Sequence, residues 1–261
     1  DQVWNLSFNR LFRSGKYYQL DFAGDSVRKV AYGASFGMKG AQPPKEGYAE
    51  LYRRFHRIGV REAFGVDVCR ETYGADAQWV LDPVFLPDRA DYDALAEESG
   101  RRVDGPFILA YILNPDEEKR RACLELRERL GGDMKVVSIC EPSEETIDLS
   151  RHVMDFAWIQ KDVTVEDFLY LYRECSYVIT DSFHGTCFSL IYRKQFMSFV
   201  NRQPDRFTVF EQFGKAAERI GRGYSREFLE TCLKPLDYEQ IEADMERERE
   251  KSRKWLEEAL Q

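Results

Sequence analysis

The sequence predicts an α/β protein built around parallel sheets, and the alternation of its apolar segments is the main reason. Short runs rich in β-formers, such as FILAYIL and KVVSIC, are separated by amphipathic stretches long enough to form helices. Parallel strands covered by helices on both faces are usually apolar along their whole length, as these runs are. The chain has 261 residues, 43% of them hydrophobic, which is enough for a large core in one or two domains.

The alternation of strands and helices is less regular in the first part of the chain. Residues 29–37 are predicted as a strand that runs into a loop rich in Gly and Ser, 49–55 as a helix and 58–60 as a second strand. A third strand is predicted at 78–81, followed by an Asp-Pro stop and a linker helix. We assign residues 1–104 to an N-terminal Rossmann-like half.

The alternation is most regular from 105 to 225, which we predict to be a second Rossmann-like domain. After the strand FILAYIL we expect a helix with Asn114 as N-cap, Pro115 in the first turn and Gly131 as C-cap. The strands KVVSIC, YVITD and FMSFV alternate with the helices TVEDFLYLYREC and TCFSLIYR. Residues 226–261 are a charged helical tail, which we expect to pack back toward the N-terminal half. Its narrow apolar stripe consists of Ile241, Met245, Ser252, Trp255 and Ala259.

Charge, hydropathy and cysteines exclude several classes of function. The formal net charge of -8 argues against nucleic acid, because polyphosphate binding needs a basic surface. No apolar run is long enough for a transmembrane helix, and no secretory leader is recognisable. The six cysteines are scattered without a C-x-x-C pair, which favours reduced core thiols in a cytoplasmic protein over disulfides or a metal site. We therefore predict neither a metal centre nor a cofactor.

Polar residues follow several predicted strands, at the edge where parallel sheets bind ligands. The segment VITDSFHG places Asp181, Ser182 and His184 directly after a strand. The next helix is predicted to begin near Gly185 or Thr186, so its N–H groups would lie beside the same space and favour an anion.

Two further clusters supply cations. Asn201, Arg202 and Arg206 follow the next strand, and Arg61 and Glu62 follow a strand of the first half. Guanidinium groups match both phosphate and carboxylate bidentately. A histidine, two or three arginines and a helix dipole at strand ends thus predict a site for a small polyanion. A phosphate ester that also carries a carboxylate fits best.

Each cluster also has a purely structural explanation. A histidine at a helix N-terminus is often a packing residue, and either Asp181 or Ser182 is expected to cap the helix. Arg61 beside Glu62 resembles an ordinary surface ion pair, and Lys194 before a short strand resembles a solvated strand end. No G-x-G-x-x-G or G-x-x-x-x-G-K-[ST] loop, no metal-ligand spacing and no G-x-S-x-G elbow is present.

A set of segments, taken in order, resembles the polysaccharide pyruvyl transferase family over residues 1–225. They are DQVWN, YGASFG, GVRE, VLDP, ITDSFHGTCFSLIYRKQF and NRQPDRF, of which TDSFHGT is the most specific. The resemblance implies a GT-B-like fold, two Rossmann-like domains facing a cleft, with the N-terminal half incomplete in this chain. It also implies transfer of the enolpyruvyl group of phosphoenolpyruvate onto sugar hydroxyls, giving a pyruvate ketal on a cell-surface or exopolysaccharide precursor.

The same resemblance makes His184 the active-site histidine and Arg61 the arginine that reaches in from the first half. We count Asp181 with them as catalytic. Arg202 is the best match to the family's donor-binding basic residue, and Arg206 is the fallback. The other residues expected to bind substrate are Glu62, Ser182, Gly185, Thr186, Lys194 and Asn201.

Phosphoenolpyruvate is the expected donor substrate. A proton must reach its methylene carbon, a sugar hydroxyl attacks C2, phosphate leaves, and a second hydroxyl closes the ketal. The unperturbed pKa of histidine suits this proton transfer, while a role for His184 as phosphate clamp stays open.

Two other classes remain as alternatives: a GT-B glycosyltransferase that uses a nucleotide sugar, and a non-catalytic module that binds sugar phosphates. The expected partners are phosphoenolpyruvate and a sugar acceptor carried on a lipid or a nucleotide, without nucleic acid. A peripheral membrane contact stays open, and the expected location is cytoplasmic.

Overall fold

A computed structural model describes residues 1–7, 15–139, 158–160 and 162–261, and its contacts divide the chain into two compact units. The first unit contains Asp1–Leu86, Gln203–Phe213 and Glu242–Gln261, and the second contains Pro87–Arg202 and Gly214–Ile241. The division after Leu86 comes earlier than the predicted one at residue 104, so the linker helix belongs to the second unit. The chain also returns to the first unit twice, with Gln203–Phe213 and with Glu242–Gln261. The second return is the one expected for the tail, whereas the first was not predicted.

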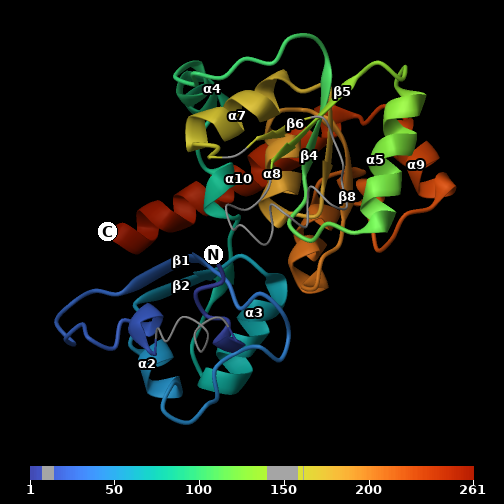
Figure 1. The fold of residues 1–261 in the computed structure, drawn as a ribbon. Coiled ribbons are helices and arrows are strands. Elements are labelled where there is room, and N and C mark those ends of the chain that lie inside the picture. Colours follow the sequence, from blue (N-terminus) through green and yellow to red (C-terminus); the bar gives the residue numbers. More distant parts are fainter. Residues whose placement is uncertain (8–14, 140–157, 161) are drawn as a thin grey trace. The chain divides into compact units, whose positions relative to one another are not determined.

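The first unit is built on a parallel sheet of order β1-β2-β3 (Figure 1). Its strands are β1 (Val30–Ala34), β2 (Arg57–Val60) and β3 (Gln78–Trp79). Its helical segments are η1 (Tyr17–Gln19), α2 (Ala49–Arg53), α3 (Ala63–Asp67), the π-helix η2 (Val68–Tyr73), η3 (Pro83–Phe85) and η4 (Pro204–Gln212). The core under the sheet is aromatic: Tyr52 and Tyr73 stack with ring centroids 4.0 Å apart, and Trp4 meets Tyr52 edge-on. Burial of these large rings is the main stabilisation of a sheet this small.

The charged tail forms α10 (Tyr238–Leu260), and the apolar stripe predicted for it is buried. From Glu242 onward it belongs to the first unit. The ring of Trp255 lies so close to β2 that a Cβ on Gly59 would be 3.1 Å from it. The hydroxyl of Ser252 accepts the N–H of Leu81 at 3.0 Å, just after β3. This helix therefore covers the face of the sheet opposite the aromatic core.

The second unit contains a parallel sheet of order β6-β5-β4-β7-β8-β9. Its strands are β4 (Phe107–Tyr111), β5 (Lys135–Ile139), β6 (Trp158–Gln160), β7 (Tyr177–Thr180), β8 (Gln195–Phe199) and β9 (Ile220–Gly221). Its helices are α4 (Arg89–Glu97), α5 (Glu117–Arg129), α7 (Val165–Glu174), α8 (Phe183–Ile191), η5 (Ala216–Arg219) and α9 (Arg226–Leu233). The helices α5 and α9 lie together on one side of this sheet, and α4 and α7 lie on the other (Figure 1). The predicted α/β class with two parallel-sheet, Rossmann-like units is confirmed.

Two predicted helix starts are corrected by the structure. Asp116, not Asn114, caps α5 by accepting the N–H of Lys119 at 2.8 Å. The predicted start of α8 near Gly185 is two residues late, because Ser182 is its N-cap and Phe183 its first residue. A capping side chain was expected before α8, but the short polar run left its register open.

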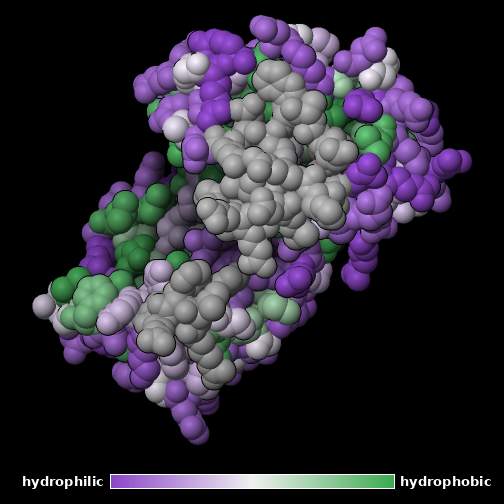
Figure 2. Space-filling view, in the orientation of Figure 1, coloured by the Kyte–Doolittle hydropathy of each residue, from purple (hydrophilic) through white to green (hydrophobic). Residues whose placement is uncertain are grey.

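The surface and the thiols agree with the composition. Among the coloured residues in Figure 2, hydrophilic side chains cover more of the surface, and hydrophobic side chains lie in smaller areas. The five cysteines in the described part of the chain are free and buried, as small core residues.

Candidate active site

In the second unit, Asp181 ties three strand-end loops together. It follows β7, and its carboxylate accepts the backbone N–H of Leu113 at 2.6 Å and that of Asn114 at 3.0 Å, both after β4. Its carbonyl accepts the side-chain amide of Asn201, which follows β8, at 3.1 Å. Asp181 is fully buried, and this desolvation raises its pKa despite the hydrogen bonds and nearby Lys119. The loops after β4, β7 and β8 are thus fixed to one another.

His184 lies in the first turn of α8, shortly after Asp181 in the chain. The hydroxyl of Ser182 accepts the N–H of Gly185 at 3.2 Å, and the N–H of Ser182 is held by Thr180 at 3.0 Å. The imidazole of His184 is partly exposed and lies edge-on to the ring of Phe183, with centroids 5.3 Å apart. The positive end of the helix dipole falls at this turn. The cap and strand end therefore hold a partly exposed imidazole where negative charge is favoured.

Gly185 and Thr186 make packing contacts in the structure. A Cβ on Gly185 would lie 2.2 Å from Oγ1 of Thr180, so only glycine lets α8 approach β7 this closely. The hydroxyls of Thr186 and Ser198 share a buried hydrogen bond of 2.7 Å between α8 and β8. Both residues thus hold α8 on the sheet beneath His184, and their contact with substrate stays a prediction.

Two further candidate cations of the second unit lie at opposite ends of β8. Lys194 precedes the strand, its Nζ donates to the carbonyls of Arg173 and Cys175 at 2.6 and 2.8 Å, and burial lowers its pKa. Arg202 follows the strand and is exposed. Because the strands are parallel, Arg202 belongs to the edge that carries His184, and Lys194 belongs to the other edge. The substrate contact predicted for Lys194 does not fit this position.

In the first unit, the ends of the parallel strands surround Arg61. Arg61 follows β2, Ser35 follows β1, and Asp82 comes shortly after β3. The guanidinium donates to Asp82 at 2.6 Å and to Ser35 at 3.1 Å. It also donates to Glu62 at 3.3 Å, and Glu62 accepts the hydroxyl of Ser35 and the N–H of Phe36. The side chain of Arg61 is only 5% exposed, so it is the centre of a closed network.

Asp1 joins this network to Arg206. One of its carboxylate oxygens accepts a hydrogen bond from Arg61, and the other accepts one from Arg206 at 2.8 Å. Arg206 also donates to Gln203 at 3.3 Å and is nearly buried. Of the two arginines predicted after β8, the structure therefore brings Arg206 to Arg61 and leaves Arg202 in the second unit.

We call this group the Arg61 cluster; it consists of Asp1, Ser35, Arg61, Glu62, Asp82 and Arg206. Two guanidinium groups in it are bonded to three carboxylates. The buried side chains of Arg61, Arg206, Glu62 and Asp82 thus all lie within this group. The donor contact predicted for Arg61 stays a prediction.

Sequence reasoning missed several members of these two groups. Asn114 was interpreted as a helix cap, Asp82 as part of a strand stop, and Ser35 as loop. Each follows a parallel strand, which is the rule that selected Arg61 and Asp181. Applied to every strand, the rule would have found all of them, whereas Asp1 follows no strand within this sequence.

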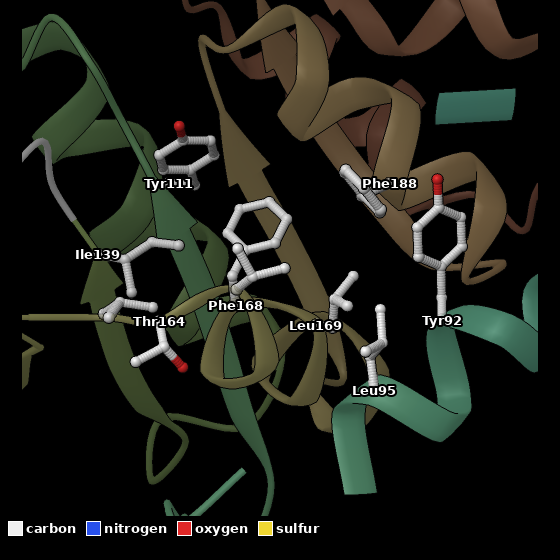
Figure 3. A pocket seen from close by; sticks show the side chains of 10 residues that line it. Tyr92, Leu95, Tyr111, Ile139, Thr164, Phe168, Leu169 and Phe188 are labelled. Atoms are coloured by element: carbon white, nitrogen blue, oxygen red, sulfur yellow. The ribbon is translucent and has the colours of Figure 1, made fainter. Parts of the chain in front are cut away.

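A cavity of about 410 Å³ lies in the second unit, among α4, α7, α8 and the ends of β4 and β5. Figure 3 shows Tyr111, Phe168 and Phe188 turned toward one another, with Tyr92 beside them. Phe168 meets both Tyr111 and Phe188 edge-on, with ring centroids 5.5 and 5.2 Å apart. The described residues of its lining include no charged side chain, so this part of the cavity suits apolar groups rather than a phosphate ester.

The described residues provide neither a metal site nor a membrane-spanning helix. No group of three or more His, Cys, Asp or Glu side chains among them is arranged to hold a metal ion. None of the helices in the same part of the chain combines the length and the apolar character needed to cross a bilayer.

Two parallel-sheet units with polar side chains gathered at their strand ends define an α/β protein of the kind that binds small ligands at a sheet edge. The family model for polysaccharide pyruvyl transferase matches residues 3–203, which is most of the chain. The chain therefore belongs to the polysaccharide pyruvyl transferase family, a family of transferases. The resemblance read from the sequence segments is thereby confirmed.

Among solved structures, the chain has a distant similarity to several proteins. The "S. aureus MnaA-UDP co-structure" is 12% identical with a TM-score of 0.48, over 91% of this chain and 63% of that one. A protein described as a UDP-N-acetylglucosamine 2-epimerase from Listeria monocytogenes is 11% identical with a TM-score of 0.45, over 77% and 55%. The wall teichoic acid polymerase TagF is 13% identical with a TM-score of 0.38, over 90% and 62%.

These likenesses are too low to carry a functional conclusion, and the chain spans 55 to 63% of the length of those proteins. The search among curated proteins finds no match.

Proposed function

We propose that this protein transfers the enolpyruvyl group of phosphoenolpyruvate onto sugar hydroxyls and forms a pyruvate ketal on a precursor of a cell-surface polysaccharide. The observation that carries the proposal is the position of His184 in a chain whose residues 3–203 match the pyruvyl transferase family. The partly exposed imidazole lies in the first turn of α8 at the end of a parallel strand. A proton-transfer group and a favourable site for phosphate are thereby combined.

The second unit supplies the groups that suit the donor. Arg202 is exposed at the same sheet edge as His184, and the residue before it is bonded to the loop of Asp181. A guanidinium binds the carboxylate or phosphate of phosphoenolpyruvate bidentately. Asp181 is fully buried with backbone partners, so it acts by holding these loops in place.

The chemistry requires one proton donor and two sugar hydroxyls. His184 delivers a proton to the methylene carbon, and C2 gains oxocarbenium character. The first hydroxyl oxygen bonds to C2 and releases its proton. The C2–O bond to phosphate then breaks, and the second hydroxyl oxygen takes that place. Of the two hydroxyl protons, one balances the new methyl group and the other leaves with hydrogen phosphate, so the products are the ketal and phosphate.

The competing functions would need different groups at the sheet edge that carries His184. A glycosyltransferase that uses a nucleotide sugar needs groups that bind a nucleoside diphosphate. The sequence contains neither of the Gly-rich nucleotide-binding loops G-x-G-x-x-G and G-x-x-x-x-G-K-[ST]. A non-catalytic module would bind a sugar phosphate without needing a proton-transfer group. The histidine in the first turn of α8 favours the transferase over both alternatives.

The test is phosphate release from phosphoenolpyruvate by the full-length protein across a panel of sugars and glycosides. We expect release that depends on one sugar class, and protection of the protein against heat by phosphoenolpyruvate. Heat protection by UDP or GDP, with no phosphate from phosphoenolpyruvate, would favour the glycosyltransferase. Ligand binding without any phosphate release would favour the binding module.

A cytoplasmic location is part of the proposal. The buried cysteines support it, because the oxidising conditions outside the cytoplasm favour disulfides, whereas thiols stay reduced in the cytoplasm. Phosphoenolpyruvate as donor also supports it, since this metabolite is made in the cytoplasm. The acceptor sugar is proposed to reach the protein on a lipid or nucleotide carrier.

A further inference from the structure

We propose that the cavity of the second unit binds the hydrocarbon chain of a lipid-linked sugar acceptor. This inference rests on the proposed function, because it chooses the lipid over the nucleotide as carrier of that acceptor. The cavity of about 410 Å³ lies among α4, α7, α8 and the ends of β4 and β5. Most of the side chains that line it are aromatic or aliphatic, among them Tyr92, Leu95, Tyr111, Ile139, Phe168 and Phe188.

The aromatic rings of the cavity keep part of their surface open. Figure 3 shows Tyr111, Phe168 and Phe188 turned toward one another. Tyr92 meets Phe188 edge-on, with ring centroids 5.3 Å apart. Phe188 is buried, whereas the other three rings are only partly buried. An apolar ligand would remove the remaining surface of these rings from water, which is favourable.

An apolar surface continues from the cavity to the outside of the second unit. Val165 is 65% exposed and Leu95 is 39% exposed, and both line the cavity. Among the described residues of the second unit, they are the large hydrophobic side chains that are exposed. Exposed apolar surface of this kind is typical of a ligand-binding groove. A lipid chain that lies partly in the cavity and partly along its rim fits both features.

The volume suits a chain of several carbon atoms. A cavity of about 150 Å³ lined by apolar side chains is enough to bind benzene. The present cavity, at about 410 Å³, has room for a longer hydrocarbon group.

The polar groups of the lining argue against a nucleotide carrier. Proteins that recognise a base stack it on aromatic rings and also form hydrogen bonds to its edges. The hydroxyl of Thr164 already accepts the N–H of Asp167 at 3.2 Å, as the N-cap of α7. The described lining residues include no charged side chain for a phosphate group. A hydrocarbon chain needs neither kind of partner.

The cavity adjoins the strand-end edge that carries His184. Tyr111 is the last residue of β4, and its carbonyl accepts the hydroxyl of Thr180, the last residue of β7, at 2.6 Å. Shortly after β4, the N–H of Leu113 is bonded to Asp181. A chain in the cavity therefore lies beside the loops that hold His184 in the proposed transfer.

The test compares two ligands of the full-length protein that share one sugar. Octyl glucoside carries a chain of eight carbons, methyl glucoside carries a single carbon, and calorimetry measures the binding of each below the concentration at which octyl glucoside forms micelles. Octyl glucoside should bind at least about tenfold more tightly, because burial of two CH₂ groups alone gives roughly that factor. UDP-glucose, as the nucleotide-linked probe, should bind no more tightly than methyl glucoside.

Leu95→Glu places a charge at the rim of the cavity and should abolish the advantage of the octyl chain. The variant should fold, because Leu95 is exposed on α4. Val165→Glu, at the start of α7, should have the same effect. The matched control is Leu260→Glu, since Leu260 is 67% exposed on α10 in the first unit. It should keep the full difference between the two glucosides.

Several results would overturn the inference. Equal binding of the two glucosides by the wild type, or no binding of octyl glucoside, means that the cavity takes no chain. An unchanged difference in Leu95→Glu and Val165→Glu means that the chain binds elsewhere. Binding of UDP-glucose that exceeds that of octyl glucoside and is lost in these variants makes the cavity a nucleotide site.

The proposed function can fail separately from this inference. Tight octyl glucoside binding that is lost in Leu95→Glu, in a protein that releases no phosphate from phosphoenolpyruvate, supports the cavity and sinks the transfer. Phosphate release with the same Michaelis constant for octyl and methyl glucoside keeps the transfer and overturns the role of the cavity.

Discussion

At the strand ends of the first unit, two buried guanidinium groups are bonded to three carboxylates. At the strand ends of the second unit, by contrast, the buried carboxylate of Asp181 is held mainly by backbone N–H groups. In the second arrangement the ammonium of Lys119 lies 3.8 Å from the carboxylate of Asp181, farther away than the backbone N–H groups. Arg202 is exposed and His184 is partly exposed at the same edge. Parallel sheets of the same kind can therefore hold their strand-end loops by different interactions.

The largest effect is expected from removing the centre of the first group. Arg61→Ala leaves Asp82, Glu62 and Asp1 without their shared partner, and breaking a buried ion pair in this way costs about 3–5 kcal/mol. Denaturant unfolding should show this loss, with Arg61→Lys less affected because the charge remains. An unchanged unfolding midpoint in Arg61→Ala would mean that the network carries little stability.

The same variant distinguishes two roles of Arg61. If it contacts the donor, as the family resemblance implies, Arg61→Lys should raise the Michaelis constant for phosphoenolpyruvate. If it only holds its carboxylate partners in place, the same change should leave that constant unchanged. The closed network around Arg61 favours the second result.

His184→Ala is expected to lower turnover by about 10²-fold or more, the usual effect of losing a proton-transfer group. The fold should survive, since the imidazole is partly exposed. His56→Ala is the control. His56 is exposed and directly precedes β2, so it lies where the strands of the first unit's sheet begin, away from the strand ends where ligands are expected. Phosphate release within about threefold of wild type in His184→Ala would make the histidine a packing residue.

A smaller effect should separate the two arginines that follow β8. Arg202→Ala should raise the Michaelis constant for phosphoenolpyruvate about tenfold, equivalent to about 1.4 kcal/mol. Arg206→Ala should leave that constant unchanged, because Arg206 is nearly buried in the first unit with Asp1 and Gln203 as partners. Steady-state kinetics with each substrate varied in turn would show the reverse order if Arg206 holds the donor.

The smallest effect concerns stability away from both strand-end groups. Asp167 is buried and accepts hydrogen bonds from Ser99 at 2.7 Å and Arg101 at 2.6 Å. Burial alone raises the pKa of Asp167, but these bonds outweigh it and leave the pKa below its usual value. A lowered pKa in the folded state means that the stabilisation is present above pH 4 or so and is lost as the pH falls further.

Asp167→Asn should therefore lower the free energy of unfolding by about 1 kcal/mol at neutral pH and by less in acid. Thermal unfolding of both proteins from pH 7 to pH 3 gives the comparison. If the difference in stability between the two proteins stays constant across this range, the ionised form of Asp167 is not what stabilises its contacts with Ser99 and Arg101.

The sequence predicted the strands of both sheets except β6 and β9, because the signals of the others are local. Apolar runs such as FILAYIL and the cap at Ser182 depend on neighbours in the chain, and they were confirmed. The position of His184 in a helix's first turn was nearly right, with the helix starting two residues earlier.

The partners of each candidate residue could not be predicted in the same way. Arg61 was interpreted as an arginine of the anion site or as a surface partner of Glu62, and only the fold brings Asp82 and Asp1 to it from distant positions. Lys194 has two backbone carbonyls as partners that no local pattern indicates. Charge at a site depends on such long-range contacts, which is why residue types were predicted better than their roles.

The most direct test of the proposed transfer follows the carbon skeleton of the donor. The full-length protein is incubated in D₂O with phosphoenolpyruvate labelled with ¹³C at C2 and with the sugar that gives the most phosphate, and the products are examined by NMR. We predict that the label appears in a ketal carbon bonded to two sugar oxygens, beside a methyl group that contains one deuterium. Labelled free pyruvate alone, or an unlabelled sugar together with nucleoside diphosphate from a nucleotide sugar, would contradict the proposed function.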